Sequence, residues 1–191
     1  TIWLSCNGEI YNYKEIKKTL LERGHKFHSE SDSEVIIHGF KEWGVEIFQK
    51  LRPDVFIQMG SSAEYGNNQS PLKENFNCKP KSSYGKSKLL STKYLIKKYK
   101  EKKFPAVIIR LFQAYGPKQA INRIIPITIN ACLKNKRFKC SSGIQTRDFV
   151  HINDLVNAIF LIFKSKESIG KIINIGSGVP KKIKEIIIFI N

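Results

Sequence analysis

The sequence contains no glycine-rich turn of the G-x-G-x-x-G or G-x-x-G-x-x-G type, although 12 of its 191 residues are glycine. Such turns allow backbone amides and a helix N-terminus to approach a pyrophosphate, so the usual phosphate loop of a dinucleotide fold is missing. No apolar run approaches the roughly 20 residues that a membrane helix requires, and the first residues show no secretory leader. We therefore expect a cytoplasmic protein without a membrane partner.

Metal-binding patterns and acidic residues are also scarce. The four cysteines (Cys6, Cys78, Cys132 and Cys140) show no C-x-x-C spacing, which argues against a metal site and indicates free thiols in a reducing compartment. Only 16 acidic residues oppose 33 Lys and Arg, so the net charge is +17. The lysines gather near the ends of predicted helices, where solvated basic faces are common. A basic nucleic-acid-binding protein is an alternative, but an anionic small substrate would also suit this charge, and we do not expect a nucleic-acid partner.

Residues 1–51 form a segment of two predicted helices. The first helix is stopped by Gly24. The second begins at 31–34, which has capping-box spacing, and carries one apolar stripe as far as Leu51. Pro53 is a natural helix stop, so we place a domain boundary there.

Residues 53–191 alternate between strand-like and helical patterns. The predicted strands cover 55–59, 106–111, 146–151 and 171–175, and the predicted helices cover 83–100, 122–134, 153–163 and a short segment after Pro180. Strands that alternate with helices imply a parallel sheet with crossover helices. We therefore expect an α/β fold with a Rossmann-like parallel sheet.

Candidate catalytic side chains gather around residues 82–88. Tyr84 and Lys88 are four residues apart, so they share one face of the predicted helix, where the ammonium would favour the phenolate form of the tyrosine. Tyr84 is therefore a candidate general acid or base. Ser62 follows the predicted strand 55–59, at the carboxyl end where open α/β sheets keep their ligands. The alternative is structural: a helix aromatic, a solvated lysine and a turn serine.

Together with their surroundings, these residues resemble the extended short-chain dehydrogenase/reductase family, the NAD-dependent epimerases, dehydratases and reductases of nucleotide sugars. The matching motifs follow the family's order at 59–66, 82–88, 110–117, 145–154 and 173–178. The resemblance implies that Ser62, Tyr84 and Lys88 are catalytic. It also implies that Tyr84 and Lys88 contact the cofactor, NAD or NADP.

The same resemblance implies the substrate and the reaction. Glu64, Gln113 and Arg147 would contact a nucleotide-sugar substrate, with Arg147 pairing to its diphosphate by charge-assisted bonds. Ala63 stands where related 4,6-dehydratases carry an acid, which favours a 4-reductase or an epimerase and is similar to the GDP-4-keto-6-deoxymannose reductases. Gln113 stands where many relatives carry asparagine, so the sugar nucleotide is left open.

The resemblance also predicts an incomplete sheet. The first β-α units of the family bind the adenosine half of NAD, and residues 53–191 contain no counterpart of them. We therefore expect impaired activity in the isolated chain. A homodimer or a complementing chain is left open.

Residues 1–51 resemble part of the glutamine amidotransferase domain of asparagine synthases, so we expect a small two-helix α+β fragment of an Ntn-hydrolase-type domain before the sheet. The matching segments are 7–13, 24–27 and 31–36. The resemblance implies that Asn7 and Gly8 form an oxyanion hole, and that Glu9 and Asp32 hold glutamine. The family's nucleophilic cysteine lies well upstream of this motif, where the sequence has no residue. Glutamine amidotransfer is therefore the alternative function.

Overall fold

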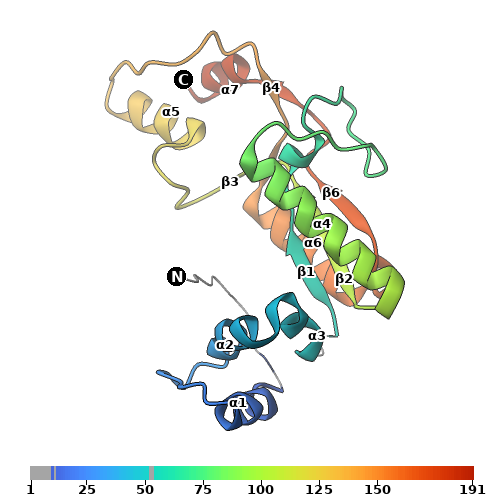
Figure 1. Cartoon of the computed structure of the whole chain (residues 1–191). Coiled ribbons are helices and arrows are strands. Elements are labelled where there is room, and N and C mark those ends of the chain that lie inside the picture. Colours follow the sequence, from blue (N-terminus) through green and yellow to red (C-terminus); the bar gives the residue numbers. More distant parts are fainter. Residues whose placement is uncertain (1–9, 11, 52–53) are drawn as a thin grey trace. The chain divides into compact units, whose positions relative to one another are not determined.

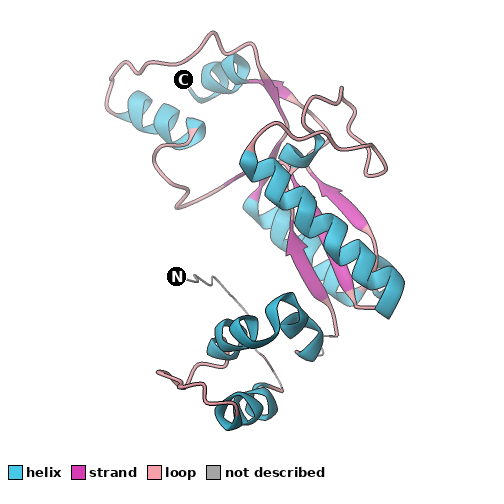
Figure 2. Cartoon of the chain, in the orientation of Figure 1, coloured by secondary structure: helices cyan, strands magenta, loops and turns pink. Residues whose placement is uncertain are grey.

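The computed structural model describes residues 10, 12–51 and 54–191 (Figure 1). The chain divides into two compact units, Thr1–Phe56 and Ile57–Asn191, so the division falls shortly after the boundary expected at Pro53. In Figure 2 the described part of the first unit is mainly helical, whereas the second unit combines strands and helices.

The described residues of the first unit form three short helices and one 3-10 turn. These are α1 (Tyr13–Glu22), α2 (Glu34–Trp43), η1 (Gly44–Glu46) and α3 (Ile47–Lys50). Its core contains the buried side chains of Ile10, Ile16, Leu20, Val35, Ile36 and Ile47. The single helix expected from residue 34 to Leu51 is interrupted, because Gly44 adopts a positive φ of 58° that ends α2.

The start of α2 also differs from the expected capping box. Ser33 is the N-cap residue, but its side chain makes no capping hydrogen bond. The Glu34 carboxylate instead accepts hydrogen bonds from the backbone amides of His28 and Ser29 and from the Ser29 hydroxyl, each at 2.8 Å or less. The bond from the Ser29 hydroxyl, with the two amide bonds, lowers the pKa of Glu34 to about 2.

The second unit is organised around a three-stranded parallel sheet. The strands are β1 (Phe56–Met59), β2 (Ala106–Leu111) and β6 (Ile172–Ile175), in the order β1-β2-β6. β2 and β6 pair in register from Ile108 opposite Ile172 to Leu111 opposite Ile175. Helix α4 (Ser83–Lys102) lies in front of the sheet in Figure 1, and α6 (Ile152–Lys164) lies behind it. Among the described residues, β1 has a strand partner on one side only.

The second unit also contains two separate two-stranded sheets. β3 (Gln113–Tyr115) pairs in parallel with β5 (Phe149–His151), and β4 (Thr146–Arg147) pairs antiparallel with β7 (Lys181–Lys182). The remaining elements are η2 (Ser62–Tyr65), α5 (Ile124–Leu133), η3 (Lys166–Ser168) and α7 (Ile183–Ile190). No helix in the described part of the chain is both long and apolar enough to cross a bilayer.

The strand predicted at 146–151 is two strands, separated at Asp148. The Asp148 carboxylate accepts hydrogen bonds from the amide and hydroxyl of Ser177 and from the amide of Gly178, at 2.6 to 2.9 Å. These bonds hold Asp148 against the turn after β6. The residues on either side of it therefore pair with different strands.

The stability of the first unit should depend on Glu34 between pH 4.5 and about 2. Because folding lowers the pKa of Glu34 from 4.5 to about 2, its ionised form favours the folded state above pH 4.5, and this contribution is lost as the pH falls through about 2. Glu34→Gln should cost about 1.5–3 kcal/mol at neutral pH, because hydrogen bonds to a charged acceptor are lost. The difference from wild type should shrink below pH 4.5.

Urea unfolding followed by tryptophan fluorescence measures this effect, since Trp3 and Trp43 both belong to the first unit. Glu30→Gln is the matched control, because the Glu30 side chain is 99% exposed. A Glu34→Gln penalty that stays constant from pH 7 to below 4.5 would contradict the assignment.

Candidate active site

The N-terminus of α4 presents Tyr84 and Lys88. Ser82 caps the helix, because its extended backbone lets its hydroxyl accept the amide of Gly85 at 3.0 Å. Tyr84 and Lys88 are therefore one turn apart, and the Lys88 Nζ lies 5.6 Å from the centre of the Tyr84 ring. The shared helix face predicted from their spacing is confirmed. Tyr84 is 56% exposed, so the residue is accessible from solvent.

Lys88 also connects α4 to the sheet. Its Nζ donates a hydrogen bond to the carbonyl oxygen of Met59, the last residue of β1, at 2.8 Å. An ammonium has three donors, so this bond leaves two for a ligand hydroxyl. The bond fixes the amino group at the carboxyl end of the strand, where parallel sheets bind their ligands.

Ser62 lies in the turn that follows β1. Ser61 caps η2: its hydroxyl accepts the amide of Ala63, and the Glu64 carboxylate accepts the amide of Ser61. This turn packs closely against the first turn of α4, because a Cβ placed on Gly85 would approach the Ala63 carbonyl oxygen to 2.6 Å. Only glycine permits that approach, which brings the turn carrying Ser62 against the helix that carries Tyr84.

The structure corrects the prediction that Glu64 contacts the substrate. Glu64 is fully buried, and its carboxylate accepts hydrogen bonds from Ser61, from the Thr92 hydroxyl at 3.0 Å and from Arg110 Nε at 3.0 Å. The Arg110 side chain is only 3% exposed. A buried carboxylate requires a cation and hydrogen-bond donors around it, and here these come from α4 and β2. Glu64 is therefore part of the interior, although its position in the motif suggested an exposed role.

A second group of polar contacts continues from this ion pair. The Arg110 guanidinium lies 4.6 Å from the centre of the Tyr65 ring and donates to the carbonyl of Glu74. The Tyr65 hydroxyl donates to Asn174 Oδ1 at 2.6 Å, and Asn174 in turn donates to the carbonyl of Leu72. Burial raises the pKa of Tyr65, so the residue acts as a neutral donor. The sequence signal for this network was a single arginine inside the otherwise apolar β2.

Gln113 and Arg147 are brought near each other through Asp148. The backbone amide of Gln113 donates to the carbonyl of Asp148 at 2.9 Å, and Arg147 immediately precedes Asp148. Arg147 is exposed on β4, where its guanidinium donates to the carbonyl of Thr146 at 2.8 Å. Their contact with a substrate stays a prediction.

The residues predicted for a glutamine site are only partly described. Asn7, Gly8 and Glu9 lie outside the described residues. The Asp32 carboxylate accepts the amide of Ile10 at 2.6 Å and the hydroxyl of Ser33 at 3.3 Å. In this structure Asp32 therefore holds the chain that enters α1.

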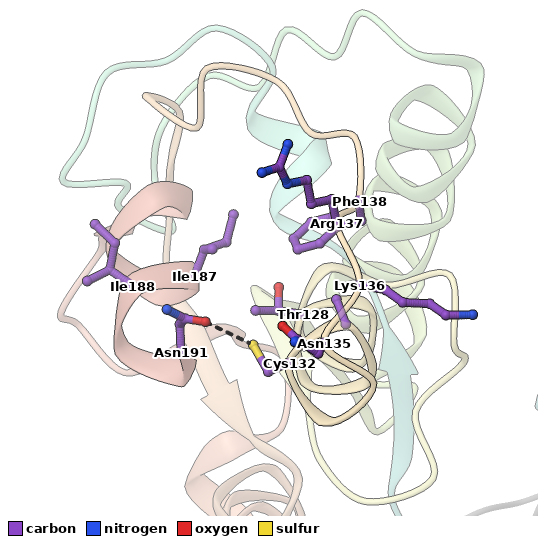
Figure 3. Close-up of a pocket in the computed structure, with 10 residues that line it drawn as sticks. Thr128, Cys132, Asn135, Lys136, Arg137, Phe138, Ile187, Ile188 and Asn191 are labelled. Carbon is purple, nitrogen blue, oxygen red and sulfur yellow. Dashed lines mark hydrogen bonds between the residues drawn. The ribbon is translucent and has the colours of Figure 1, made fainter.

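A pocket of about 420 Å³ opens between α5 and α7 (Figure 3). Cys132 of α5 donates a weak hydrogen bond to Asn191 across its floor at 3.6 Å. Ser62, Tyr84, Lys88 and Arg147 are not among its lining residues, so this pocket is separate from the candidate active site.

A parallel sheet flanked by helices, with a serine after one strand and a Tyr-Lys pair on the next helix, defines a Rossmann-like α/β protein. The model of the NAD dependent epimerase/dehydratase family matches residues 44–176, and the chain belongs to this family. The glutamine amidotransferase domain model matches residues 1–58. Both resemblances seen in the sequence are therefore confirmed.

Individual relatives agree with these matches. Human dTDP-D-glucose 4,6-dehydratase is 30% identical over 146 residues, which cover 74% of this chain and 41% of that protein. The solved UDP-glucuronic acid 4-epimerase of Bacillus cereus, in complex with UDP-glucuronic acid and NAD, is 30% identical with a TM-score of 0.70, covering 77% of this chain and 48% of that one. The chain thus spans less than half the length of these two relatives.

The first unit has a relative of its own. A putative glutamine-hydrolysing asparagine synthetase of Methanocaldococcus jannaschii is 54% identical over 46 residues, which cover 24% of this chain and 8% of that protein.

Arg110→Met should destabilise the second unit by about 3–5 kcal/mol, because it leaves the buried Glu64 carboxylate without its cation. Urea unfolding followed by far-ultraviolet circular dichroism measures the loss. Arg123→Met, at an exposed arginine, should change stability by less than about 0.5 kcal/mol. Adding Glu64→Leu to Arg110→Met should recover part of the loss. A penalty for Arg110→Met no larger than that of the control would contradict the role of the ion pair.

Proposed function

We propose that the second unit carries the catalytic and substrate-binding part of an NAD(P)-dependent nucleotide-sugar oxidoreductase or epimerase. The observation that carries the proposal is the arrangement of Ser62, Tyr84 and Lys88 at the carboxyl end of β1, in a chain of this family. Tyr84 would accept or return the proton of a sugar hydroxyl. Lys88 would stabilise the phenolate, and Ser62 would hold the reacting oxygen in line.

The residues on the nicotinamide side fit a cofactor of this type. Lys88 keeps two donors beyond its bond to Met59, which suits the hydroxyls of a ribose. The nicotinamide, when bound, supplies the hydride exchange. The chain's own contribution is to place the phenol, the ammonium and the serine hydroxyl around the sugar carbon and its oxygen.

Reduction or epimerisation at the sugar C4 fits the residues better than 4,6-dehydration. Dehydration requires a further acid to expel water, and Ala63 supplies none. The neighbouring Glu64 is fully buried, with its carboxylate held by Arg110 and Thr92, so it does not face a sugar. A carboxylate for water elimination is thus missing from the turn that carries Ser62.

The substrate would be held by its diphosphate. Arg147 is exposed and suits a diphosphate because its planar guanidinium makes paired charge-assisted bonds. Gln113 lies on β3, which pairs with β5, and its side-chain carboxamide can offer a donor to the same ligand. The net charge of +17 also attracts a polyanionic nucleotide.

The adenosine half of the cofactor would depend on residues that this sequence does not contain, since it has no glycine-rich phosphate turn. A complementing polypeptide that provides a strand, a glycine-rich turn and a helix would supply the missing amides. A homodimer is the second arrangement that we consider.

A sugar nucleotide should bind the isolated chain, and Arg147 should be required for it. We expect saturation-transfer NMR signals from GDP- or UDP-sugars with the wild type and with Tyr84→Phe, because the phenol acts on the reacting centre and not on the diphosphate. Arg147→Ala should lose the signals. Arg123→Ala is the matched control at another exposed arginine and should keep them. Absence of signals for the wild type, or equal signals for both arginine variants, would contradict the substrate proposal.

NAD should bind the isolated chain more weakly than in the micromolar range, because its pyrophosphate meets no glycine-rich turn. A calorimetric titration with NAD and NADP, with and without a bound sugar nucleotide, measures this directly. Micromolar affinity for either cofactor would show that the missing turn is not needed and would overturn the proposal of a complementing polypeptide.

A further inference from the structure

Two histidines of the first unit face each other. The Nδ1 atoms of His25 and His38 are 3.2 Å apart, and the rings meet edge to face at 79°. The side chains are 15% and 10% exposed. Neither residue takes part in the function proposed for the second unit.

Each ring is held from behind by a carboxylate. His25 Nε2 lies 3.0 Å from Glu42 Oε2, and His38 Nε2 lies 3.2 Å from Glu34 Oε1. Glutamate side chains are ionised at neutral pH, so both carboxylates can only accept hydrogen bonds.

It follows that both Nε2 atoms carry a proton. In a neutral imidazole with a protonated Nε2, the Nδ1 atom has a bare lone pair. The lone pairs of His25 and His38 then point into the same 3.2 Å gap, where they repel each other unless a cation lies between them. The surrounding charges favour a cation as well, because two carboxylates are opposed by one guanidinium, that of Arg23 beside Glu42 at 2.6 Å.

The cation is either a proton shared in a His–His hydrogen bond or a metal ion, and the separation suits both. The surroundings of the two rings point to the metal ion. Two nitrogen ligands at about 2.0–2.1 Å from a tetrahedral zinc ion lie roughly 3.3–3.4 Å apart, which is close to the observed 3.2 Å. A carboxylate behind the second ring nitrogen is also the usual surrounding of a metal-binding histidine.

We propose that His25 and His38 bind one divalent transition-metal ion of the zinc class through their Nδ1 atoms, with Glu42 and Glu34 orienting the rings. Among the described residues, no group of three or more His, Cys, Asp or Glu is arranged around a metal. Water or a further ligand therefore completes the coordination, as in zinc sites that keep open positions. The ion would connect the loop between α1 and α2 to the middle of α2.

The test uses Zn²⁺ with the full chain, free of any affinity tag and with its thiols alkylated. Calorimetry at neutral pH should show one Zn²⁺ per chain. His25→Gln and His38→Gln should each abolish binding, whereas His28→Gln should leave it unchanged, because the His28 side chain is exposed and outside the pair. Long-range ¹H–¹⁵N spectra of the wild type should show that Zn²⁺ shifts the Nδ1 signals of two histidines only.

The outer carboxylates provide a second readout. Glu42→Gln should weaken Zn²⁺ binding by about 10-fold to 100-fold while both ligands remain.

Three results would overturn the proposal. One is an unchanged Nδ1 spectrum of the wild type at millimolar Zn²⁺. Another is binding that survives both His25→Gln and His38→Gln. The third is a metal-free spectrum with one doubly protonated ring that Zn²⁺ does not alter, which would identify the cation as a shared proton. The wild-type spectra decide the question even if His38→Gln, at a buried position, fails to fold.

Discussion

The ion pair between Glu64 and Arg110 determines how the second unit is assembled. Both side chains are withdrawn from water, so each must be satisfied inside the protein, and a loss of register between their elements would leave a buried charge unpaired. Glu64 belongs to the turn after β1, and Arg110 belongs to β2. The pair therefore holds that turn against the neighbouring strand and keeps Ser62 at the carboxyl end of the sheet.

The same carboxylate sets the position of α4. Thr92 donates its hydroxyl to Glu64, and Lys88, one turn earlier, donates to the end of β1. Tyr84 lies one further turn towards the N-terminus. Residues 84, 88 and 92 thus form one stripe on α4. Lys88 is bound to the end of β1, and Thr92 is bound to the turn that follows it. The position of the phenol follows from these two bonds and from the close approach of Gly85 to Ala63.

Local sequence signals predicted the elements whose causes are local. The helix predicted from residue 83 begins there in the structure, where Ser82 caps it, and β2 and β6 lie within the predicted strands 106–111 and 171–175. The split of the strand at Asp148 could not be predicted, because its carboxylate is bound by Ser177 and Gly178, about 30 residues away in the sequence. Gly44 ended α2 through its positive φ, a signal that the apolar stripe concealed.

The candidate site shows the same difference between features with local causes and features that depend on distant residues. The prediction that Tyr84 and Lys88 share a helix face depended only on helical spacing, and in the structure the two side chains lie next to each other. The role of Glu64 depended on burial and on partners from two other elements, which no local pattern contains. The signal that was available was Arg110, because a charge within a buried strand requires a partner of opposite charge.

The contacts that position Ser62, Tyr84 and Lys88 are physically separable from the requirements of dinucleotide binding. Several contacts within residues 57–191 position these side chains: the bond from Lys88 to Met59, the close packing of Gly85 against Ala63, and the Glu64–Arg110–Thr92 network. A pyrophosphate needs backbone amides at a glycine-rich turn, and the sequence contains no such turn. The contacts that position Lys88 and the helix carrying Tyr84 do not depend on that turn, because they are made at the end of β1 and in the interior of the second unit.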